Sequence, residues 1–76
     1  MENEKNDINA EIIDEIKNKT RALYELAKAY INTGPKYYAR AKGILERILN
    51  SNPNYREAME LLEELEKKMK EIEGGL

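Results

Sequence analysis

Carboxylates are the most numerous side chains in this sequence that could do chemistry. The 76 residues include 15 Asp and Glu residues but no His or Cys, so imidazole bases, thiol nucleophiles and the corresponding metal ligands are missing. Ser51 is the only serine, and it lies among turn-forming residues with no His to activate it. A carboxyl pKa rises only through burial or a forced pair of like charges, and neither is evident. The sequence therefore predicts no catalytic site, no metal site and no cofactor.

The carboxylates instead follow a pattern typical of a solvated helix surface. Near the C-terminal end, three glutamates each precede a lysine by four residues, as Glu63 with Lys67, Glu64 with Lys68 and Glu66 with Lys70. This spacing places opposite charges on one face of a helix, in the more favourable order. Calcium loops and glycine-rich phosphate loops are absent from the sequence, because the four glycines are scattered.

The overall charge argues against a nucleic-acid or membrane partner. Thirteen basic and 15 acidic side chains leave a net charge of −2, too little to steer the chain towards polyanions. The five tyrosines have no basic stripe around them, so we expect them to pack in the core rather than stack on bases. The sequence shows no signal peptide and no apolar run long enough to span a bilayer. We therefore expect a cytoplasmic protein.

Helical periodicity and two turn signals give the fold class. Apolar residues repeat at spacings of three and four, without strand-like alternation. Residues 32–35, Asn-Thr-Gly-Pro, join a helix-ending Gly to a Pro that cannot continue the helix. Residues 50–53, Asn-Ser-Asn-Pro, offer capping side chains and a Pro suited to a first helical turn. We expect an all-α fold of three antiparallel helices at about 7–33, 36–50 and 53–73. They would form a single domain over 7–73, with flexible tails at 1–6 and 74–76.

Two weak points stand out within these helices. Residues 18–20, Asn-Lys-Thr, have modest helix propensity; we expect one continuous first helix, with a break there as the alternative. Gly43 costs roughly 1 kcal/mol relative to Ala in an exposed helix interior, which a close approach by a neighbouring helix would offset. The residues expected to form most of the core are Ile16, Leu23, Leu26, Ala27, Tyr30, Ala41, Ile44, Leu45, Ile48, Leu62 and Leu65.

The spacing of eight residues between positions 20 and 65 resembles the signature of a known repeat family. These residues are Leu23, Leu26, Ala27, Tyr30, Gly34, Ala41, Leu45 and Pro53. The pattern is similar to that of tetratricopeptide repeats, in which two helices form a hairpin. Two features depart from it: the stretch from Tyr30 to Ala41 is two residues longer, and the chain holds only one full hairpin. A generic three-helix bundle with coincidental spacing is the alternative.

The resemblance also implies a binding face. In tetratricopeptide repeats the inner face of the first helix lines a groove for peptides. Carried onto this chain, that face comprises Arg21, Tyr24, Lys28, Ile31 and Asn32. Arg21 and Lys28 resemble part of a clamp for the acidic end of a peptide. No partner is expected to be obligatory.

Two functions from different classes remain open. The first is a designed or engineered helical scaffold without a natural ligand, because six residue types are absent and helix-favouring pairs fill the surface. The second is a natural adaptor that binds a peptide or partner protein through the face of its first helix. We expect a monomer, although the regular apolar seam of the third helix could also pair between chains.

Overall fold

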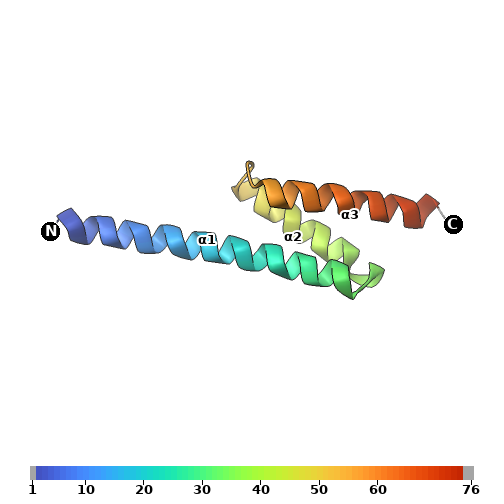
Figure 1. Ribbon diagram of the computed structural model, residues 1–76, viewed down its shortest axis with the longest axis horizontal. Helices are drawn as coiled ribbons and strands as arrows, with labels where there is room; N and C mark the ends of the chain where they lie inside the picture. Colours follow the sequence, from blue (N-terminus) through green and yellow to red (C-terminus); the bar gives the residue numbers. More distant parts are fainter. Residues whose placement is uncertain (1, 75–76) are drawn as a thin grey trace.

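The computed structural model describes the backbone of residues 2–74 and the side chains of residue 15 and residues 17–74. The elements are α1 (Glu2–Thr33), the short 3₁₀ helix η1 (Pro35–Tyr37), α2 (Tyr38–Ser51) and α3 (Arg56–Gly74). Helix α2 runs back along α1, and α3 reverses direction again, so α1 and α3 point the same way (Figure 1). The described backbone contains no strand, which confirms the predicted all-α fold of three antiparallel helices.

Helix α1 is longer than the sequence pattern indicates. It begins at Glu2 rather than near residue 7, and it passes unbroken through residues 18–20. Extending an existing helix costs much less than starting one, so turns can be added to the end of a helix that has already formed. The expected N-terminal tail is therefore helical from Glu2 onwards. Met1 and residues 75–76, which belong to the two expected tails, lie outside the described residues.

The first turn depends on Gly34. Its φ of 145° lies in a region that side-chain-bearing residues rarely adopt. The Gly34 N–H donates to the Tyr30 carbonyl at 3.3 Å, and the Thr33 hydroxyl donates to the Ala29 carbonyl at 2.8 Å. The first bond closes the last turn of α1, and the second adds a side-chain donor to a carbonyl of that turn. Pro35 then opens η1, which delays the start of α2 by two residues relative to the predicted residue 36.

The second turn uses its proline differently from the prediction. The Asn52 N–H donates to the Ile48 carbonyl at 2.8 Å and ends α2. The Tyr55 N–H then donates to the Asn52 carbonyl at 3.1 Å, which closes a turn around Pro53. Pro53 therefore lies in the turn, where its fixed φ is equally suitable, and not in the first turn of a helix. For this reason α3 begins at Arg56, three residues later than expected.

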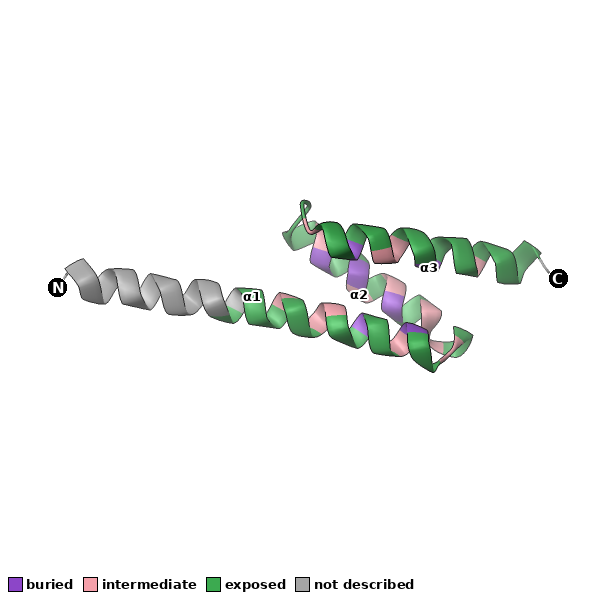
Figure 2. Ribbon diagram, in the orientation of Figure 1, coloured by how far each residue is buried: buried purple, intermediate pink, exposed green. Residues whose placement is uncertain are grey.

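Helix α2 is the centre of the core. It packs against both other helices, whereas α1 and α3 touch each other only slightly. The buried residues are Ala27, Ile31, Ala41, Leu45, Ile48, Ala58 and Leu65. They face inward from all three helices (Figure 2). Three of these seven are alanines, whose small side chains let the helix backbones approach closely while Leu45 and Leu65 fill the space between them.

Two positions on α1 exchange the roles that the sequence predicts for them. Leu26, expected in the core, is 44% exposed, whereas Ile31, expected on the peptide-binding face, is only 8% exposed. The cause is α2, on which α1 mainly packs, because the face of α1 that meets it contains Ala27 and Ile31. The buried face of α1 is therefore turned towards Ile31. The side chain of Ile16, another predicted core residue, lies outside the described residues.

Gly43 also differs from its prediction. It is exposed, and a Cβ atom built on it would have no neighbouring atom within 4 Å. The expected close approach of another helix does not occur at this position. The conformational cost of Gly43 is consequently not offset by packing.

We predict that Leu45→Ala lowers the free energy of unfolding by about 2–5 kcal/mol, because Leu45 is fully buried and its removal leaves a cavity. Leu26→Ala is the matched control and should cost below about 1 kcal/mol, since much of that side chain already contacts water. Urea denaturation followed by circular dichroism measures both values. Equal losses of unfolding free energy in the two variants would contradict the burial of Leu45 and the exposure of Leu26.

We also predict that Gly43→Ala raises the free energy of unfolding by about 1 kcal/mol. The new methyl group meets open space, so it reduces the entropy of the unfolded chain without a clash. For a domain of this size the melting temperature should rise by about 4–8 °C. A lower melting temperature would contradict the open environment of Gly43.

Candidate functional site

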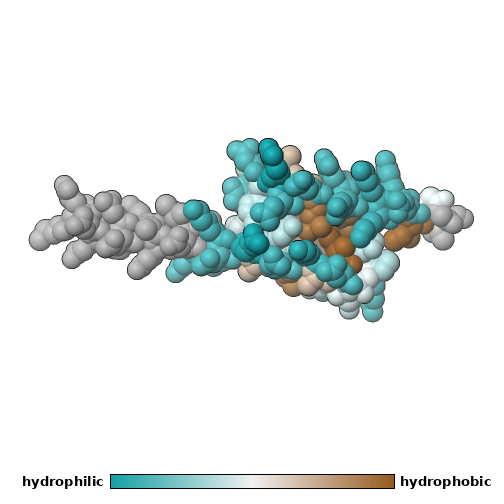
Figure 3. Space-filling view, viewed as in Figure 1, coloured by the Kyte–Doolittle hydropathy of each residue, from teal (hydrophilic) through white to brown (hydrophobic). Residues whose placement is uncertain are grey.

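Tyr24, one of the five residues predicted to bind peptides, lines a shallow groove between α1 and α3. The groove has a volume of about 230 Å³ and is lined by Tyr24, Glu57, Glu60, Leu61 and Glu64. Apolar surface is visible between α1 and α3, bordered by polar side chains (Figure 3). Tyr24 supplies the α1 wall, and the other four lining residues come from α3.

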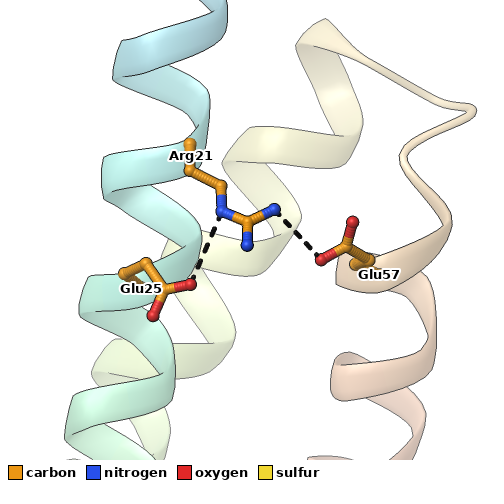
Figure 4. Close-up of polar contacts among 3 residues, drawn as sticks. All are labelled: Arg21, Glu25 and Glu57. Atoms are coloured by element: carbon orange, nitrogen blue, oxygen red, sulfur yellow. Dashed lines mark hydrogen bonds and ion pairs between the residues drawn. The ribbon is translucent and has the colours of Figure 1, made fainter.

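Arg21 bridges the two walls at one end of this groove. Its Nε lies 3.6 Å from Glu25 Oε2, one turn along α1, and its Nη1 lies 3.4 Å from Glu57 Oε2 on α3 (Figure 4). The guanidinium carbon also lies 5.8 Å from the centroid of the Tyr24 ring. The pKa of Arg21 is raised by the Tyr55 hydroxyl and then by the Glu57 carboxylate. Arg21 is therefore already engaged within the chain.

Tyr24 lies half-buried beside this bridge. Burial of its ring raises the pKa of the Tyr24 hydroxyl, and the carboxylates of Glu57 and Glu25 raise it further. The positive charge of Arg21 opposes these effects in part. A neutral Tyr24 hydroxyl is thus favoured in the folded protein.

The five predicted site residues do not form one surface. Lys28 and Asn32 are exposed on α1, Tyr24 is half-buried, and Ile31 belongs to the core. Arg21 and Lys28 are two helical turns apart, about 10 Å along the axis. An acidic peptide in the groove would also face the three glutamates of the α3 wall. The arrangement is electrostatically suited to a cationic segment and not to the acidic peptide end that we expected.

A second groove, which sequence reasoning missed, lies between α1 and α2. It has a volume of about 270 Å³ and is lined by Tyr30, Arg40, Gly43, Ile44 and Arg47. The spacing of Lys36, Arg40 and Arg47 along one face of a helix was the signal that could have revealed it.

The cationic side chains of this stripe adjoin two stacked tyrosines. Tyr30 stacks on Tyr37 with ring centroids 5.4 Å apart, and Lys36 Nζ lies 5.9 Å from the Tyr37 ring centroid. The expectation that the tyrosines have no basic stripe around them is therefore wrong for these two.

The described part of the chain shows no cluster of possible metal ligands. Among those residues, no three acidic, His or Cys side chains gather closely enough to hold a metal ion. None of the described helices is both long enough and apolar enough to cross a bilayer. The two grooves are thus the candidate functional surfaces.

Comparison with known proteins finds no family model, no curated protein and no solved structure that matches this chain. The resemblance to tetratricopeptide repeats therefore rests on residue spacing alone. The helix order and directions agree with it at the level of an all-α fold.

We predict that Tyr24 ionises at a higher pH in the folded chain than in the unfolded chain, which gives a late component in the titration. The unfolded chain loses the Tyr24 proton first, so between the two pKa values the folded state holds more protons and stability falls with increasing pH. The contribution is complete below the unfolded pKa and is lost as the pH passes the folded pKa. Tyrosinate absorbance, measured with and without urea, should show the late component only in the folded protein. Tyr24→Phe should abolish it; a late component that persists in this variant would assign it elsewhere.

Proposed function

We propose that the chain is a non-enzymatic helical scaffold that acts as a monomer in the cytoplasm and has no obligatory ligand. The observation that carries this proposal is the separation of polar and apolar groups. Within residue 15 and residues 17–74, every buried residue is apolar and no charged side chain is buried. Catalysis needs ionisable groups held out of bulk water, and this arrangement does not supply them.

A designed or engineered origin is part of this proposal. The surface of α3 carries the favourable Glu-before-Lys pairs, and six residue types are absent from the sequence. Gly43 argues against a design, because an idealised helix would carry Ala at an exposed interior position. A redesign or a chimera of natural helical fragments accounts for both features.

A tetratricopeptide-like adaptor is the second candidate, and the groove between α1 and α3 favours it. The groove combines a half-buried aromatic ring, Tyr24, with the half-buried Leu61 and three carboxylates. Such a surface suits a peptide with an apolar side chain flanked by lysine or arginine. This reverses the charge of the ligand that the sequence resemblance implied.

An NMR titration with two extended peptides of equal length and apolar content, one lysine-rich and one glutamate-rich, tests these alternatives. The scaffold proposal predicts no saturable shift of the Tyr24 and Leu61 amides with either peptide. Saturation by the lysine-rich peptide alone, lost in E60K/E64K, would reject the scaffold in favour of the adaptor. A matched control, Glu63→Lys with Glu66→Lys, changes the net charge equally at exposed positions of α3 outside the groove lining. A molecular mass, measured by light scattering, that doubled as the protein concentration rose would reject the monomer.

A further inference from the structure

The floor of the groove between α1 and α2 is the α2 backbone at Gly43, which no side chain covers. α3 occupies another side of α2, where Met69 of α3 shares depressions with Tyr38, Ala39 and Lys42. On the groove side Gly43 leaves the α2 backbone uncovered, and no atom fills the space that its side chain would take. Glycine at this position lowers helix stability relative to alanine, and no packing within this chain compensates for the loss. It does allow another backbone to approach α2 closely.

Two arginines flank this floor without partners. Arg40 precedes Gly43 by one turn and Arg47 follows it by one turn, and both line the groove. Neither makes an ion pair within residue 15 or residues 17–74, in contrast to Arg21 with its two carboxylates. No acidic side chain lines the groove. Its electrostatic complement is therefore a pair of carboxylates.

The α1 wall of the groove is apolar. Tyr30 lines it, and Leu26 lies one turn earlier on the same side of α1, with 44% of its surface exposed. Ile44 adds a half-buried apolar side chain from α2. The surface thus presents an apolar strip along α1 beside a cationic edge along α2.

The distance between the two arginines favours a helical ligand over an extended one. Arg40 and Arg47 are two turns apart, about 10 Å along α2. On a helical ligand, carboxylates seven residues apart lie on one face with this separation. On a β-strand the same distance is about three residues, which places the two side chains on opposite faces.

From these features we propose that the groove between α1 and α2 binds an acidic amphipathic helix of a partner protein. The apolar stripe of that helix packs on Leu26, Tyr30 and Ile44, and two of its carboxylates, seven residues apart, pair with Arg40 and Arg47. Gly43 admits the helix backbone between them. α3 of a second copy also carries glutamates seven residues apart, such as Glu64 and Glu71, but it is a poorer complement because its apolar stripe already packs on the core of its own chain. This inference goes beyond the scaffold proposal, which requires no ligand.

The test uses a synthetic helical peptide of about 18 residues, with leucines spaced by three and four and glutamates seven residues apart beside them. Fluorescence anisotropy measures its Kd for the full chain. The double variant R40E/R47E should weaken binding by at least about tenfold, and raising salt from about 50 to about 500 mM should weaken binding to the unchanged chain. Gly43→Leu fills the groove and should also weaken binding by about tenfold. Circular dichroism confirms that each variant stays folded.

Two controls make the result specific. The double variant K67E/K68E changes the net charge by the same amount as R40E/R47E, at exposed positions of α3 outside this groove, and should leave the Kd within about twofold. A peptide with lysines in place of the glutamates should bind at least about tenfold more weakly. Equal losses for the two double variants, or an unchanged Kd in Gly43→Leu, would overturn the proposal. So would self-association of the chain that R40E/R47E abolishes, because the occupant would then be a second copy.

Discussion

The packing of α2 between α1 and α3 around Leu45 is the interaction on which the rest of the structure depends. Leu45 and Leu65 are the largest fully buried side chains, and the remaining buried residues are small or lie beside them. Because α1 and α3 barely touch, neither has another route to bury its apolar stripe. The described residues contribute seven buried side chains, a small core, so the packing around Leu45 sets the positions of both outer helices.

The small size of the core bears on the kind of function that the chain can support. No charged group is buried among the described residues, so their charged side chains lie where a partner could meet them. Two grooves on the surface have opposite character. The one between α1 and α3 is walled by glutamates, and the one between α1 and α2 by arginines. The distribution of charge, and not the net charge of −2, therefore decides what could bind.

The candidate site could be predicted only in part. Placing Arg21 and Tyr24 on one face of a helix was correct, because both belong to the same helix and periodicity relates them directly. The wall opposite them belongs to α3, some 30 residues later in the chain, and its glutamates reverse the expected ligand charge. The pairing of Arg21 with Glu57 depends on the same juxtaposition. The stripe of Lys36, Arg40 and Arg47 was readable in the sequence, but only the position of α1 makes it the edge of a groove.

By itself, the sequence determined the number of helices, their approximate ends and their antiparallel course. Those features depend on local preferences, namely the spacing of Leu and Ile, the positive φ of Gly34 and the fixed φ of Pro35 and Pro53. Only the tertiary structure decided the rotation of each helix about its own axis. A stripe of apolar residues on a helix spans a wide arc, and its buried part depends on where the neighbours pack. α1 packs mainly on α2 through the face that holds Ala27 and Ile31, so Ile31 enters the core while Leu26 stays partly exposed to water.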